Sequence, residues 1–139
     1  MEDIFERWIN KHHDNSFITD GIPFPEIYEQ EPHKVLFILK EPHDESCGIG
    51  DQIDTYRNYA LNQSNEDFRG IISKIGALYS SIWGDGADAR ESIKKIAFMN
   101  LKKSGGSAEC DDKYLGKYVD NVRDLIIEQI NIINPDYIV

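Results

Sequence analysis

Ionisable side chains gather directly after the apolar run Val35–Leu39. The residues at that point are Lys40, Glu41, Pro42, His43, Asp44 and Glu45. The run contains β-branched and aromatic residues and has Pro on both sides, which is typical of a strand buried on both faces. In open parallel sheets, ligands bind beyond the carboxyl ends of the strands. We therefore expect ligand binding or acid–base chemistry here, and a solvated charged loop is the alternative.

A second apolar run also ends in polar residues. Ile96–Met99 is followed by Asn100, Leu101, Lys102 and Lys103. Because the carboxyl ends of parallel strands meet at one edge of a sheet, we expect Asn100 to share a pocket with Glu41.

Apolar residues at helical spacing predict the elements that position these strands. Three longer helices are expected, over residues 3–13, over residues 68–83 between an Asn65 cap and Gly84, and from a cap at Asp111 or Asp112 to Asn134-Pro135. Residues 87–92 are expected to form a short helix.

Three segments carry weaker signals. Residues 15–33 are rich in Gly and Pro, which predicts a wrapping loop with at most a short helical turn near 26–30. Residues 44–50 predict a flexible turn. Residues 51–62 fit either a short helix over the sheet edge or a lid that faces substrate.

The alternation of strands and helices predicts an α/β fold with right-handed crossovers. We expect one three-layer α/β/α domain over residues 1–139, with parallel strands near 35–40, 96–100 and 136–139 and the first of them central. The chain stops as the third strand begins. We expect either the front part of a longer domain, truncated at its C-terminus, or self-association through the terminal strand.

Charge and cysteine content restrict the class of protein. The 139 residues carry a net charge of -10, which opposes binding to nucleic acid unless basic residues gather on one face. Such a phosphate-facing patch is expected between Arg90 and Lys103. Two cysteines without metal-ligand spacing, an acidic N-terminus and no membrane-length apolar run predict a cytoplasmic protein without metal, cofactor or membrane contact.

The order of the motifs resembles the uracil-DNA glycosylase superfamily. An apolar strand leads into a Pro-containing loop, Phe68-Arg69-Gly70 enters a helix, Asn100 ends a strand before Lys102, and a long helix ends in Asn-Pro-Asp-Tyr-Ile-Val. Family members carry Gly-Gln-Asp-Pro-Tyr-His, Gly-Glu-Ala-Pro-Gly or Gly-x-Asn-Pro-Gly after the first strand. This chain has Leu39-Lys40-Glu41-Pro42-His43-Asp44 there.

The resemblance implies a role for each matching residue. Glu41 would orient the attacking water, Asn100 would read the pyrimidine edge, and Phe68 would stack on the base. Further substrate contacts are expected from Lys40, Pro42, His43 and Lys102.

The chain also departs from the family pattern. Leu39 replaces the Gly that lets the backbone approach a ligand, and His43 replaces Gly or Tyr, so we expect a differently shaped pocket. The family's His-containing loop, which steadies the departing base, would lie beyond Val139. The iron-sulfur branches need four cysteines. We therefore expect this chain not to excise uracil efficiently.

Two function classes follow. The first is a glycosylase-like hydrolase in base repair, acting on DNA or on a free nucleoside or nucleotide, whose smaller size suits an acidic protein. The second is a non-catalytic member of the same fold that binds a nucleotide or a protein partner.

Overall fold

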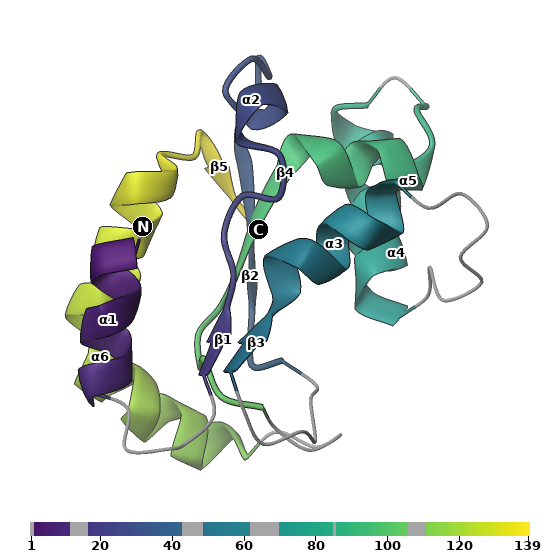
Figure 1. Cartoon of the computed structure of the whole chain (residues 1–139). Helices are drawn as coiled ribbons and strands as arrows, with labels where there is room; N and C mark the ends of the chain where they lie inside the picture. The colour runs from purple at the N-terminus through teal and green to yellow at the C-terminus, as the bar shows by residue number, and fades with distance from the viewer. Residues whose placement is uncertain (1, 12–16, 43–48, 62–69, 85, 106–110) are drawn as a thin grey trace.

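A three-stranded parallel sheet lies at the centre of the computed structural model, which describes residues 2–11, 17–42, 49–61, 70–84, 86–105 and 111–139. The strand order is β4 (Ile96–Asn100), β2 (Val35–Leu39), β5 (Tyr137–Ile138) (Figure 1). In the register, Leu39 pairs with Asn100 and Val35 pairs with Tyr137. The expected parallel strands, with the first of them central, are confirmed.

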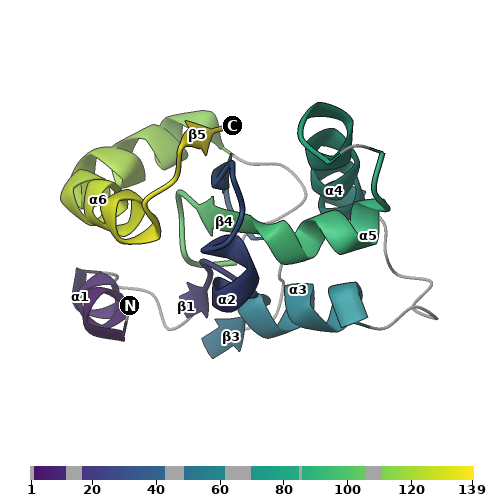
Figure 2. The ribbon, with the colours of Figure 1, turned by 90° about the horizontal axis from the view of Figure 1, so that it is seen from above.

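Helices cover both faces of this sheet. On one face lie α1 (Glu2–Lys11) and α6 (Asp112–Ile133), and on the other lie α3 (Gln52–Leu61), α4 (Gly70–Ile82) and α5 (Ala89–Ser92) (Figure 2). Side chains of a strand alternate between its faces, so Leu36 packs in the α1–α6 layer while Val35 and Phe37 pack in the other. The α/β class is therefore confirmed, with the layering expected for it.

The longest helix begins and ends at the expected signals. The Asp111 side chain caps α6 by accepting from the backbone nitrogens of Lys113 and Tyr114. Asn134 ends it in the left-handed conformation, with φ of 50°. Of the other expected helix signals, Asn65 and Phe68 lie outside the described residues. None of the described helices is both long enough and apolar enough to cross a membrane.

Two short strands correct the expected loops. β1 (Phe17–Thr19) and β3 (Ile49–Asp51) pair in parallel. β1 lies within the expected wrapping loop, and β3 begins at the end of the expected flexible turn. The expected helical turn in the first segment is α2 (Pro25–Tyr28). The strands were missed because pairing with distant segments stabilises them: Ile18 N donates to Lys103 O at 2.7 Å, and Phe98 N donates to Gly21 O at 2.9 Å. These bonds hold Asp20 beside β4.

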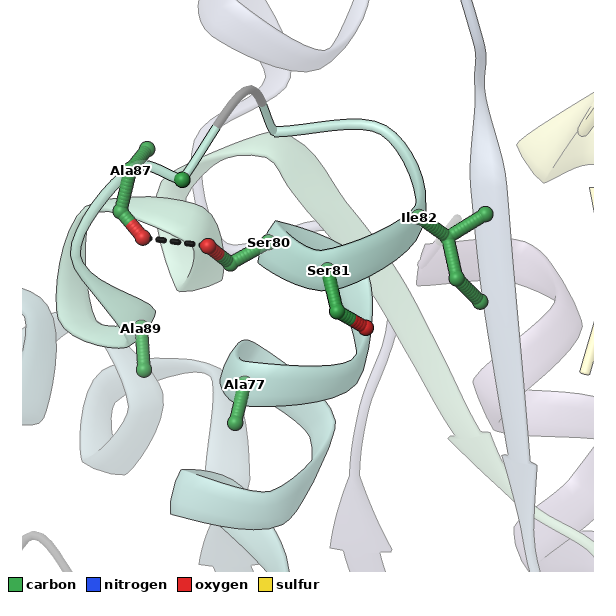
Figure 3. A pocket seen from close by; sticks show the side chains of 7 residues that line it. Ala77, Ser80, Ser81, Ile82, Ala87 and Ala89 are labelled. Atoms are coloured by element: carbon green, nitrogen blue, oxygen red, sulfur yellow. Dashed lines mark hydrogen bonds between the residues drawn. The ribbon is translucent and has the colours of Figure 1, made fainter.

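The layer of α4 and α5 contains a close helix contact and a cavity. A Cβ atom at Gly76 would lie 2.1 Å from the backbone oxygen of Ala89, so only Gly fits there. The short 3-10 helix η1 (Ile93–Lys95) then leads into β4. The cavity, of about 570 Å³, lies beside this contact (Figure 3). Its lining consists of Ala77, Ser80, Ser81, Ile82, Gly86, Ala87 and Ala89.

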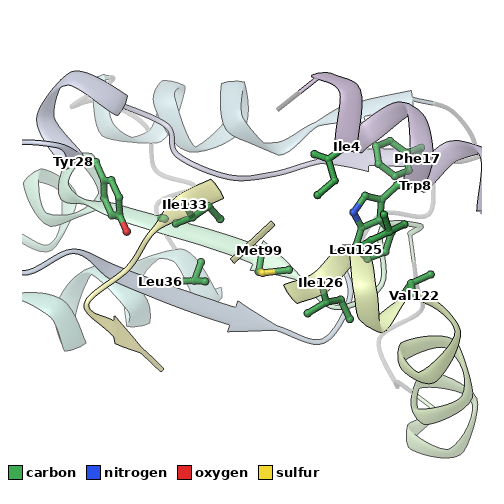
Figure 4. Close-up of a cluster of buried hydrophobic side chains, with 11 residues drawn as sticks. Ile4, Trp8, Phe17, Tyr28, Leu36, Met99, Val122, Leu125, Ile126 and Ile133 are labelled. Atoms are coloured by element: carbon green, nitrogen blue, oxygen red, sulfur yellow. The ribbon is translucent and has the colours of Figure 1, made fainter. Parts of the chain in front are cut away.

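The opposite layer is a continuous apolar core. Ile4 and Trp8 of α1 face Leu125 and Ile126 of α6, and Met99 reaches them from the sheet (Figure 4). Burial of such side chains contributes about 1.5–3 kcal/mol each relative to exposure. This core fixes α6, and with it one side of the polar network described below.

Candidate functional site

The polar residues that follow β2 and β4 line one cavity of about 590 Å³ at the carboxyl edge of the sheet. Glu41 and Asn100 are both part of its lining, together with Lys40 and Pro42. The remaining lining residues are Ile38, Leu39, Gln52, Thr55, Tyr56, Tyr59, Ile71 and Ile72. The structure therefore brings together two of the three principal candidate residues, Glu41 and Asn100, while their chemical roles stay predictions.

Backbone pairing continues beyond the two strands and joins their polar loops. Leu101 N donates to Leu39 O at 2.8 Å, and Lys102 N donates to Lys40 O at 3.0 Å. As a result, Lys102 Nζ lies 2.9 Å from Glu41 Oε2, and the two side chains are only 12% and 11% exposed. Of this ion pair, Glu41 is a lining residue of the cavity. Lys40 instead pairs with Asp112 on the exposed side, at 2.7 Å.

Asn100 is a buried lining residue of the cavity. The residue is 1% exposed, and its Nδ2 donates to Gln52 Oε1 at 2.8 Å and to Asp20 Oδ2 at 3.3 Å. Its Oδ1 has no hydrogen-bond partner among the residues that the structure describes. Buried polar atoms are nearly always hydrogen-bonded, and Asn100 Oδ1 is one of five such unpaired side-chain atoms among the described residues. Of the five residues that carry them, Asn100 is the one that lines this cavity.

Gln52 complements that acceptor with a donor. Asp51 starts α3 by accepting from Ile53 N at 2.8 Å, which sets Gln52 as the first helical residue. The Gln52 Oε1 atom is used by Asn100, and its Nε2 forms no hydrogen bond within the part of the chain that the structure describes. Together, Asn100 and Gln52 offer one acceptor and one donor to a ligand.

The carboxylate of Asp20 lies behind Asn100 and is fully buried. It accepts from Asn100 N at 2.7 Å, from Gln129 Nε2 at 2.8 Å and from Lys103 Nζ at 2.6 and 2.7 Å. These donors come from two places far from Asp20 in the sequence, one at the end of β4 and in the loop after it, the other in α6. The network therefore ties α6 and the loop after β4 to Asn100.

Lys103 is as deeply buried as its partner. Its ammonium also lies 5.0 Å from the centre of the Trp8 ring, a cation–π contact. Burial lowers the pKa of Lys103, while the charge and hydrogen bonds of Asp20 act in the opposite direction. An ion pair removed from water in this way is costly to break.

One face of α3 forms an aromatic wall of the cavity. Tyr56 stacks on Phe98 with ring centres 3.7 Å apart and planes 7° apart, and Tyr59 lines the cavity one turn further. Burial also raises the pKa of the Tyr56 hydroxyl. Of the two interpretations left open for residues 51–62, the helix is correct, and it also faces the cavity.

Other expected site features have different outcomes. His43 and Phe68 lie outside the described residues. The expected phosphate-facing patch is wrong in its composition, because Lys103 is buried and the neighbouring lysines pair with carboxylates. Those pairs are Lys94 with Glu91, Lys95 with Glu31 and Lys102 with Glu41.

Sequence reasoning missed Asp20, Gln52 and Lys103. Asp20 precedes Gly21 in a Gly- and Pro-rich segment, where Asp usually stabilises a turn. Lys103 was assigned to the charge run around it. Only Gln52 had a signal, since its segment was one alternative for a substrate-facing element.

The cavity of Figure 3 differs in chemistry, because the described residues that line it include no ionisable side chain. Among the described residues, no group of three or more His, Cys, Asp or Glu side chains could hold a metal ion. Comparisons with protein-family models, with curated proteins and with solved structures found no match to this chain.

Proposed function

We propose that the cavity between β2, β4 and α3 binds a nucleobase, and that the chain is a glycosylase-like hydrolase of the uracil-DNA glycosylase type. The observation that carries this proposal is the unpaired Oδ1 of the buried Asn100 beside Glu41 in one cavity. Glycosylases hold a base by its hydrogen-bonding edge and stack it on an aromatic ring. A cavity with an amide acceptor and an aromatic wall supports that mode of binding.

The edge of the base would meet two amides. Asn100 Oδ1 accepts from a ring N–H, and Gln52 Nε2 donates to the neighbouring carbonyl oxygen. The Gln52 contact is an addition to the residues that the sequence resemblance implies. Stacking would come from Phe68, as the resemblance implies, or from the Tyr59 ring on the wall.

Glu41 would position the water. Its Oε2 is held by Lys102, which leaves Oε1 to accept from a water molecule directed at the sugar carbon. In this arrangement Lys102 orients the carboxylate. In hydrolysis, the bond between the sugar carbon and the base nitrogen would break and the base would leave as an anion with the bonding electron pair. The water oxygen would bond to that carbon, and Glu41 would take the water's proton.

A free nucleoside suits the chain better than DNA. The net charge of -10 repels a polyanion, and the lysines at positions 94, 95 and 102 are neutralised by nearby carboxylates. A nucleoside carries no phosphate and avoids this repulsion.

The ion pair of Lys102 with Glu41 also favours a second candidate, a non-catalytic nucleobase-binding protein. A carboxylate committed to a lysine at 2.9 Å has less capacity to take a proton from water. The two candidates share the binding site and differ only in bond cleavage.

The test measures free uracil released from deoxyuridine and from uracil-containing single- and double-stranded oligonucleotides. We expect slow release from deoxyuridine that falls by about 100-fold or more in Glu41→Gln, the usual contribution of a general base. Release from the oligonucleotides should be weaker still. Glu29→Gln is the matched control, since Glu29 pairs with Lys34 away from the cavity lining.

Binding separates the two candidates. We measure binding of uracil to the wild type, to Asn100→Ala and to the control Asn58→Ala. If uracil binds the wild type and the control but not Asn100→Ala, and no hydrolysis is detected, the non-catalytic candidate is supported. Asn58 is exposed on α3 and is not a lining residue of the cavity. If neither uracil nor deoxyuridine binds the wild type, the nucleobase proposal is wrong.

A further inference from the structure

The network behind the cavity leaves the Asn100 amide little freedom. An ionised carboxylate accepts hydrogen bonds and donates none. Since Asp20 Oδ2 contacts the Asn100 side chain, Nδ2 has to face it, because the reverse orientation would bring two oxygens together. The backbone nitrogen of Asn100 donates to the same Oδ2 atom at 2.7 Å, so Asp20 holds the residue at two points.

Gln52 could not fix this orientation by itself. Its amide can offer either oxygen or nitrogen to Asn100, and a rotation of both amides would keep the bond between them. The acceptor-only character of Asp20 therefore determines which atom of Asn100 remains for a ligand, and that atom is Oδ1.

Lys103 keeps the carboxylate in place. Both of its contacts to Asp20 are short, at 2.6 and 2.7 Å, and both side chains are fully buried. A buried carboxylate needs such a counter-charge. Gln129 Nε2 also donates to Asp20 Oδ1 at 2.8 Å, so both oxygens of the carboxylate accept hydrogen bonds.

We propose that Asp20, with Lys103 as its counter-charge, is a positioning residue that fixes the Asn100 oxygen toward the cavity and so selects heterocycles with a ring N–H beside a carbonyl. This inference rests on the proposed nucleobase function for its ligand class. Imides and lactams such as 1-methyluracil, whose substituted N1 leaves only the N3–H, present that edge. 1-Methylcytosine and 1,3-dimethyluracil do not, because N3 is an acceptor in the first and methylated in the second.

The first readout is independent of any ligand. The side-chain NH₂ signals of Asn100 in ¹⁵N–¹H spectra are assigned by their loss in Asn100→Ala. In the wild type we expect both protons to exchange slowly with water. In Asp20→Asn/Lys103→Met, which removes both buried charges together, that protection should fall by about tenfold, as expected for loss of one hydrogen bond.

The second readout is the preference for 1-methyluracil over 1-methylcytosine and over 1,3-dimethyluracil, measured by titration calorimetry or ligand-observed NMR. A ligand that leaves the buried polar atoms of Asn100 and Gln52 unpaired loses binding free energy. The wild type should therefore show a preference of about tenfold or more. That ratio should approach one in the double variant. Lys11→Met/Asp124→Asn is the matched control, because it neutralises an exposed ion pair between α1 and α6 at 2.8 Å.

The outcomes separate the inference from the function on which it rests. Unprotected Asn100 protons in the wild type, or an unchanged ratio in the folded double variant, would overturn the positioning role. If protection depends on Asp20 while none of the three probes binds, the network positions Asn100 and the nucleobase function is what fails. Loss of protection and of preference together supports both.

Discussion

Lys103 and Lys94 both form ion pairs, but water reaches them differently. Lys103 and its partner Asp20 are fully buried, whereas the Lys94 and Glu91 side chains are 22% and 53% exposed. A buried charge that loses its partner has no water to replace it, while an exposed charge is solvated at once. The same type of substitution at the two positions should therefore have unequal effects.

Lys103→Met should lower the free energy of unfolding by about 3–5 kcal/mol, the usual cost of leaving one buried charge unpaired. Lys94→Met should cost less than about 1 kcal/mol. Urea denaturation followed by tryptophan fluorescence measures both. Because Lys103 lies over the Trp8 ring, its loss should also change the native emission. Equal effects of the two substitutions would mean that water reaches Asp20.

At the residue scale, sequence reasoning identified part of the cavity lining but not the residues behind it. Glu41 and Asn100 could be placed because each directly follows an apolar strand and the ends of parallel strands meet. Asp20 could not be placed, since its partners lie 80 to 109 positions away and no local pattern links them. Local periodicity carries no information about which distant donor a carboxylate meets.

At the element scale, α4 and α5 depend on one glycine. A methyl group at Gly76 would collide with the Ala89 backbone oxygen, and backbone atoms can move only if the helices separate. Gly116 on α6 has open space around its hydrogen, so a methyl group there meets nothing within 4 Å. The chain thus contains two helical glycines with opposite requirements.

Gly76→Ala should destabilise the protein by about 1–3 kcal/mol, the usual cost of overpacking. Gly116→Ala should stabilise it by about 0.5–1 kcal/mol, because Ala loses less backbone entropy in a helix. Thermal or urea unfolding compares both with the wild type. If Gly76→Ala is neutral, α4 and α5 do not approach each other as closely as described.

The element pattern also explains which strands were foreseen. β2, β4 and α6 carry five or more residues of consistent apolar pattern, and sequence periodicity was sufficient for them. β1 and β3 have three residues each and lie in polar or Gly-rich surroundings. Their pairing is a property of the assembled molecule, so no local signal predicted it.

At the scale of the whole molecule, the net charge of -10 should govern which ligands reach the cavity. Repulsion between the protein and an oligonucleotide is strongest at low salt, where the screening length is longest. Affinity for a uracil-containing oligonucleotide should therefore rise as ionic strength increases to about 0.15 M. Affinity for deoxyuridine should stay constant. Fluorescence anisotropy and calorimetry measure the two.

A fall in oligonucleotide affinity with salt would contradict this prediction, because it would indicate counterion release from a basic surface. A variant such as Glu29→Gln/Glu128→Gln, which removes two negative charges at exposed ion pairs, should weaken the repulsion at low salt. Nucleoside binding should not respond to it.

Asp20 bonds to residues far along the sequence, and this separation also affects when the cavity can form. Proteins are made from the N-terminus, and contacts between distant residues form late because long loops must close first. Asp20, Glu41 and Gln52 are synthesised well before Lys103 and Gln129, which lie 83 and 109 positions after Asp20. A nascent chain on the ribosome therefore contains the lining residues Glu41 and Gln52 before it contains the donors that complete the network around Asp20. The network around Asp20 is complete only when α6 has emerged and docked.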